Sequence, residues 1–163
     1  MSTNILESLD SSEIRELRIE ILAKRSMGNV LFEVKQINSD YIVENAENLL
    51  EILDLFTSQM GYLAIGDRWK EIDQVAAKKI LVFILTKDLA YSAKIMPIEQ
   101  AEKISTKIFN LFKNNCKFFT NALFVNNYSA LSAWDSLTQA TFDTGVIFIS
   151  DTQMGILWVK DED

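Results

Sequence analysis

The chain has 163 residues, 48% of them hydrophobic, and its 23 acidic residues outnumber its 16 basic ones to give a net charge of −7. This length and apolar content predict a single domain over residues 1–163 with a hydrophobic core of its own. The acidic balance argues against binding to nucleic acid or to an anionic membrane, because both attract Lys and Arg. It favours a basic protein partner, or it serves solubility alone.

Three elements are predicted in the first part of the chain. Ser11 is a candidate N-cap for a helix that ends near Met27. The alternation of apolar and polar residues over 29–37 predicts a strand. A second helix is predicted from Asp40 to about Met60, with its apolar side chains opposite a row of acids.

The middle of the chain favours further helices. Asp67 is a candidate cap for a long helix over 68–96, whose centre is apolar on all sides and therefore predicts a buried spine of the domain. The next helix, over 97–113, begins at a proline, which suits a first helical turn. The stretch 117–125 fits either a helix or a strand, and 128–137 favours a helix.

The C-terminal segment predicts a β-hairpin. The runs at 145–150 and 155–160 are rich in β-branched and aromatic residues and flank the turn segment 151–154. Both strands are apolar on both faces, so either the protein covers two sides of the hairpin or one side receives another molecule. We expect Trp158 to be a core residue, and among the tryptophans it is the best candidate for a partner contact. Together these elements predict a helix-rich α+β domain with about five helices and a hairpin able to pair with an earlier strand.

The chain lacks the residues of the common catalytic sites. It contains no histidine, which removes Ser-His-Asp and Cys-His catalysis and most transition-metal sites. It also contains no glycine-rich phosphate-binding motif. Cys116 without a histidine is expected to be a packed residue, and the acidic end at 161–163 a solvated tail. We therefore expect no enzymatic activity, no cofactor and no bound metal.

The sequence favours a cytoplasmic protein. Cys116 is the single cysteine, so no disulfide can form within the chain. The N-terminal residues lack the basic and apolar regions of a signal peptide. The longest apolar run, Ile80 to Leu85, is far shorter than the ~20 residues that cross a bilayer.

The most informative pattern is a row of five carboxylates between Asp40 and Asp54. Their spacings of 4, 3, 4 and 3 place them along one line of a helix, and no Lys or Arg occurs from Gln36 to Asp67. Repulsion between the like charges costs on the order of 1 kcal/mol. Either bases of the middle segment, such as Lys78 and Lys79, neutralise this row, or a basic partner does. The predicted partner-binding residues are Asp40, Glu44, Glu47, Glu51, Asp54, Trp158, Asp161, Glu162 and Asp163.

The C-terminal stretch "AWDSLTQATFDTGVIFISDTQMGILWVKDED" resembles the end of small acidic bacterial proteins of the toxin-immunity type. The resemblance covers about 30 residues and contains no catalytic motif. It implies a non-enzymatic cytoplasmic inhibitor that binds a cognate toxin, often a basic nuclease, and occludes its active cleft. The carboxylate row would take the place of phosphates in that cleft; this placement follows from the spacing of the acids and not from the resemblance.

A second class of binding protein remains as the alternative. A secretion chaperone or adaptor would hold an apolar partner segment against the edge of the hairpin, and an enzyme ranks third. Salt separates the first two classes, because an electrostatic inhibitor associates faster at low salt and a hydrophobic clamp does not.

Overall fold

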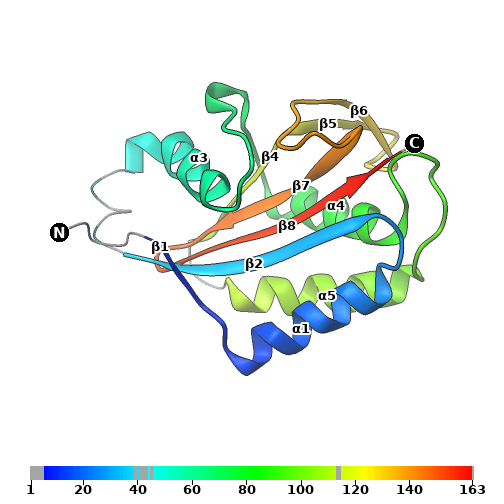
Figure 1. The fold of residues 1–163 in the computed structure, drawn as a ribbon, viewed down its shortest axis with the longest axis horizontal. Helices are drawn as coiled ribbons and strands as arrows, with labels where there is room; N and C mark the ends of the chain where they lie inside the picture. The colour runs from blue at the N-terminus through cyan, green and yellow to red at the C-terminus, as the bar shows by residue number, and fades with distance from the viewer. Residues whose placement is uncertain (1–5, 39, 41–43, 45, 113–114, 163) are drawn as a thin grey trace.

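The computed structural model is built around one six-stranded antiparallel sheet with helices on both faces (Figure 1). It describes residues 6–38, 40, 44, 46–112 and 115–162. The strands are β1 (Leu6–Ser8), β2 (Asn29–Ile37), β3 (Lys70–Ile72), β4 (Lys117–Thr120), β5 (Ala122–Val125), β6 (Ala130–Trp134), β7 (Phe142–Ile149) and β8 (Gln153–Asp161). The large sheet has the order β1-β2-β8-β7-β4-β3, and β5 pairs with β6 in a separate hairpin.

Within the described residues the helices divide between the two faces of the sheet. They are α1 (Ser12–Lys24), α3 (Leu49–Gln59), α4 (Gln74–Thr86) and α5 (Ile98–Leu111), with 3-10 turns η1 (Ala46–Asn48) and η2 (Gly66–Arg68). Helices α1, α4 and α5 cover one face and α3 covers the other (Figure 1). None of these helices is long and apolar enough to cross a membrane.

The first core lies between α1, α4, α5 and the sheet. Helix α4 contributes side chains such as Ile80 and Ile84, which are fully buried. Phe148 of β7 stacks on Phe112 at 5.0 Å between ring centroids. Gly155 of β8 is required beside this pair, because a Cβ at that position would collide with the ring of Phe112. Aromatic packing therefore sets how closely the end of α5 approaches the sheet.

The second core lies under α3. Leu53 and Phe56 of α3 are fully buried in one cluster with Ile147 and Trp158 of the two central strands. Trp158 also makes an edge-to-face contact with Trp69, at 6.2 Å between centroids. The chain itself thus covers both faces of the β7–β8 hairpin, and Trp158 is a core residue.

A buried ion pair joins the end of α1 to the end of β8. The guanidinium of Arg25 donates two hydrogen bonds to the carboxylate of Asp161, at 2.8 and 3.1 Å, and both side chains are 0% exposed. Arg25 also donates from Nε to the carbonyl of Ile84 at 2.7 Å, and Asp161 accepts from the backbone N–H of Leu89 at 2.8 Å. The pair therefore fixes α1, the end of α4 and the last strand against one another.

Several predicted elements are confirmed. The strand over 29–37 is β2, and the Ser11 hydroxyl accepts from the N–H of Ile14 at the start of α1. The C-terminal hairpin pairs with β2 through β8. The helix after Pro97 is α5, with Pro97 itself as its N-cap residue.

The helix-rich fold with about five helices is wrong, because the protein is rich in sheet. The stretch 128–137 contains β6 where a helix was favoured, and 117–125 contains β4 and β5. The long helix over 68–96 is also shorter than predicted: 70–72 form β3, and Asp73, not Asp67, caps α4. Their local patterns fit a helix or a strand, and pairing decides between the two. Strands β3 and β4 are held by distant partners, and β6 pairs with the neighbouring β5.

We expect Asp161→Ala to lower the free energy of unfolding by about 3–5 kcal/mol, because it leaves the buried guanidinium of Arg25 without its carboxylate. Lys24→Ala removes a partner from an exposed ion pair on α1 and should cost about 0.5 kcal/mol or less. Urea unfolding of both variants measures the difference. Similar losses for the two variants would contradict a special role for the buried pair.

Candidate partner-binding surfaces

The predicted acidic helix is interrupted and not continuous, although Asp40 and Glu44 are both helical as predicted. Helix α3 starts at Leu49, and the 3-10 turn η1 precedes it, so the prediction of one continuous helix from Asp40 is wrong at residues 46–48. The parts of the prediction that fall on 41–43 and 45 lie outside the described residues. A 3-10 turn advances each residue by a different angle from an α-helix, so the acids do not form one straight row.

Four of the five predicted acids nevertheless lie at the surface. The side chains of Asp40, Glu44, Glu47 and Glu51 are exposed, and no ion pair involves them within the described part of the chain. Lys78 and Lys79 lie on α4, which packs on the opposite face of the sheet from α3. We call the exposed acids Asp40, Glu44, Glu47 and Glu51 the acidic surface.

Asp54, the fifth acid, has an internal role. Its carboxylate accepts hydrogen bonds from the backbone N–H groups of Ile65 and Gly66, at 3.0 and 3.1 Å. It also accepts from the indole N–H of Trp69 at 2.9 Å. Asp54 therefore anchors the turn η2 and the ring of Trp69 to α3, and we do not count it among the partner-binding residues.

The C-terminal candidates are also mostly internal. Trp158 is 0% exposed and donates its indole N–H to Asp143 at 3.1 Å. Asp161 lies in the buried pair with Arg25, so the interpretation of this residue as part of a solvated tail is wrong. Glu162 is exposed and accepts from the hydroxyl of Thr141 at 2.6 Å. Asp163 lies outside the described residues.

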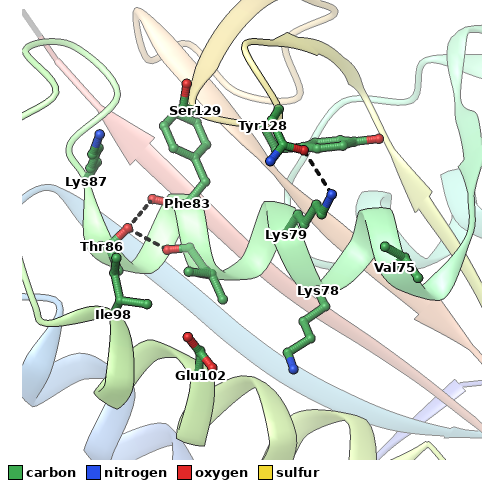
Figure 2. A pocket seen from close by; sticks show the side chains of 12 residues that line it. Val75, Lys78, Lys79, Phe83, Thr86, Lys87, Ile98, Glu102, Tyr128 and Ser129 are labelled. Carbon is green, nitrogen blue, oxygen red and sulfur yellow. Dashed lines mark hydrogen bonds between the residues drawn. The ribbon is translucent and has the colours of Figure 1, made fainter.

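A groove of about 470 Å³ lies on the other face of the sheet (Figure 2). Helix α4 forms its centre. In Figure 2, Tyr128 and Ser129 of the β5–β6 turn lie on one side of α4, and Ile98 and Glu102 of α5 lie on the other. We call this feature the α4 groove. Its size is within the range of roughly 300–1,000 Å³ that is typical of ligand sites.

The wall of the α4 groove contains an unusual backbone. Asn126, Asn127 and Tyr128 are three consecutive residues with positive φ, at 54°, 54° and 62°. Asparagine tolerates this left-handed conformation, but tyrosine adopts it only at a cost of about 1 kcal/mol or more. The turn is tied to α4 because Lys79 donates to Asn127 at 2.9 Å and lies 5.8 Å from the centroid of the Tyr128 ring.

The sequence prediction missed the α4 groove. The central run of α4 indicated a helix buried all round, and Ile80, Leu81 and Ile84 are indeed buried. The first turn of the helix is different, because Val75 is 64% exposed there. The one local signal for the groove wall was the pair Asn126–Asn127, which is typical of a turn.

Two titratable groups are shifted by their surroundings. Burial raises the pKa of the Cys116 thiol to about 12, against a smaller opposing effect of a backbone hydrogen bond. Burial and the charge of Asp143 raise the pKa of Tyr62 to about 12. Both groups are therefore protonated at neutral pH, which makes Cys116 a poor nucleophile. Within the described residues, no group of three or more His, Cys, Asp or Glu side chains is placed to hold a metal ion.

Comparison of the chain with protein-family models, curated proteins and solved structures finds no match.

We expect Asp54→Ala to lower the free energy of unfolding by about 1–3 kcal/mol, because it leaves the N–H groups of η2 and Trp69 without their acceptor. Glu51→Ala, one turn earlier on α3, removes an exposed acid that forms no ion pair with the described residues and should change stability by about 0.5 kcal/mol or less. Thermal and urea unfolding of the two variants provide the measurement. Equal effects would mean that Asp54 behaves as an ordinary surface acid.

Proposed function

We propose that this protein is a non-enzymatic cytoplasmic binding protein that neutralises a basic protein partner, in the manner of bacterial toxin-immunity proteins. The observation that supports this proposal is the acidic surface. Glu44, Glu47 and Glu51 are exposed, and no cation pairs with them within the described residues. Exposed acids that no described cation neutralises are suited to a partner of opposite charge.

The alternative is that bases of the same chain neutralise the acidic surface. The ion pairs that the structure describes do not support it. Lys79 donates a hydrogen bond to Asn127. The cations that do form ion pairs contact other acids, such as Asp10, Glu20 and Asp135. Exposed carboxylates of this kind attract a cationic protein over about one Debye length, ~8 Å at physiological salt.

A basic nuclease toxin is the partner class that we favour. The phosphate-binding cleft of such an enzyme attracts anions, and a group of carboxylates can occupy it in place of nucleic acid. The stretch that resembles immunity proteins contains β7 and β8 in the middle of the sheet. That stretch therefore contributes the scaffold, and the proposed contact residues lie outside it.

The hairpin edge is not available for an apolar partner segment. Strand β8 pairs with β2 and β7, and β7 pairs with β8 and β4, so both strands have neighbours on either side. An adaptor that adds a strand to this hairpin is therefore not part of the proposal.

The direct test co-expresses the protein with the products of the reading frames next to its gene. The expected result is that the protein suppresses the growth arrest or nuclease activity caused by one basic product. Suppression should require formation of a complex that survives gel filtration. Failure to bind any basic product of these reading frames would contradict the immunity class.

We expect the triple change Glu44→Gln, Glu47→Gln and Glu51→Gln to slow association with the basic partner and to flatten the salt dependence of the rate. The free energy of unfolding should stay unchanged or rise by up to about 1 kcal/mol, because repulsion is removed and Gln is a good helix former. Stopped-flow mixing over a salt series and a thermal melt measure the two effects.

The matched control for this triple change removes the same charge elsewhere. Glu13, Glu16 and Glu99 are exposed acids on α1 and α5, and no ion pair of the described residues involves them. Changing them to Gln should leave the association rate close to that of the wild type. A loss of stability in the first variant, together with an unchanged association rate, would show that the acids are neutralised within the protein.

A further inference from the structure

The α4 groove supports a second proposal, which goes beyond the proposed function. We propose that it binds an amphipathic, acidic helical segment of a protein partner, with the apolar face of that segment in the groove and its carboxylates on the surrounding lysines. The groove lies on the α4–α5 face of the sheet, and the acidic surface lies at the start of α3. The two surfaces share no residues, so each proposal can fail without the other.

Apolar side chains make the groove suitable for an apolar face. Val75 is 64% exposed and Ile98 is 58% exposed, although both are large hydrophobic residues. Val82 and Phe83, both on α4, complete the apolar lining. Exposed apolar residues along a groove are typical of a binding surface, because covering them releases ordered water.

Lysines surround this apolar lining and define the charge of the occupant. Lys78 and Lys79 come from α4 and Lys87 is its C-cap residue, and Glu102 is the one acid among the described residues that line the groove. In Figure 2, Lys78 points towards the α5 side of α4 and Lys79 towards the β5–β6 turn. An apolar occupant with flanking carboxylates would therefore find cations on both sides, while a basic occupant would be repelled.

The left-handed turn supplies a rigid aromatic wall. Tyr128 holds positive φ in a turn that two contacts with Lys79 tie to α4, and its ring also packs against Phe124 at 5.7 Å. Strained backbone is retained where the surrounding structure enforces it, and it clusters at functional sites. A half-buried tyrosine beside exposed apolar residues and lysines is the kind of side chain that dominates binding energy at interfaces.

Helical peptides recognised by grooves insert residues from one face, at i, i+3, i+4 and i+7. In the α4 groove, helix α4 lies at the centre. The β5–β6 turn forms a wall on one side of it and the first turns of α5 form a wall on the other. We therefore favour a helical occupant over an extended strand, because a strand would need unpaired backbone groups along the groove, and the lining is made of side chains.

The test uses a fluorescein-labelled synthetic peptide of about 14 residues, close to the length of α4, with Leu on one face and Glu on the other. A second peptide carries Lys in place of every Glu. Fluorescence anisotropy with the full chain should show binding of the acidic peptide at least about tenfold tighter than that of the basic one. Added salt should weaken the binding without abolishing it, because burial of the Leu face is insensitive to charge screening.

Surface variants with matched controls locate the peptide. Ile98→Asp should weaken binding of the acidic peptide by about tenfold. Ile19→Asp changes an equally exposed isoleucine on α1, which is 66% exposed, and should have no effect. Tyr128→Asn keeps a residue that tolerates positive φ but removes the ring, and it should weaken binding while the unfolding transition is retained.

Charge reversal provides the second comparison. Lys78→Glu with Lys87→Glu should reduce or remove the preference for the acidic peptide over the basic one. Lys103→Glu with Lys117→Glu makes the same change in net charge at exposed lysines that do not line the groove, and it should preserve the preference.

Three outcomes would overturn the proposal. The first is equal binding of both peptides, or binding that Ile98→Asp leaves unchanged. The second is self-association in sedimentation that Lys78→Glu with Lys87→Glu abolishes, which would make a second copy of this chain the occupant. The third is binding of a small carboxylate amphiphile such as laurate in the absence of any peptide binding, which would make the groove a small-molecule site.

Discussion

The buried pair of Arg25 and Asp161 is the constraint on which the arrangement of the helices depends. Two charges without access to water are stable only when their hydrogen-bonding groups are satisfied. Here Arg25, at the end of α1, donates to Asp161, at the end of β8, and to the carbonyl of Ile84. Asp161 also accepts from the N–H of Leu89. Such a pair adds little net stability compared with apolar packing, but it penalises any arrangement in which α1 or α4 is displaced. The position of α4 in turn sets the position of the groove.

Two sets of acids in this protein look alike in the sequence but have different roles in the structure. Asp54, Asp143 and Asp161 accept hydrogen bonds from N–H groups and stay inside or partly inside the fold. Glu47 and Glu51 are exposed and form no ion pair within the part of the chain that the structure describes. The net charge of the chain therefore does not tell which acids a partner can reach.

Sequence patterns predicted the elements whose signals are local. The strand at 29–37 alternates, Ser11 caps its helix through its own hydroxyl, and the hairpin strands are β-rich. They failed where distant pairing decides the structure, as in β3 and β4, and where a carboxylate is used by residues further along the chain, as with Asp54 and Ile65. The groove was beyond prediction for the same reason, because its walls come from three segments that only the fold brings together.

The two proposed surfaces should act on different steps of binding because of how each is built. The acidic surface includes a 3-10 turn and exposed side chains, so its effect is mainly a long-range field that raises the rate of association and is weakened by salt. The α4 groove is fixed by a helix whose other face is packed on the sheet, and by a turn tied to that helix through Lys79. A rigid apolar surface of this kind retains its occupant by shape and burial, so changes at Ile98 or Tyr128 should act mainly on dissociation.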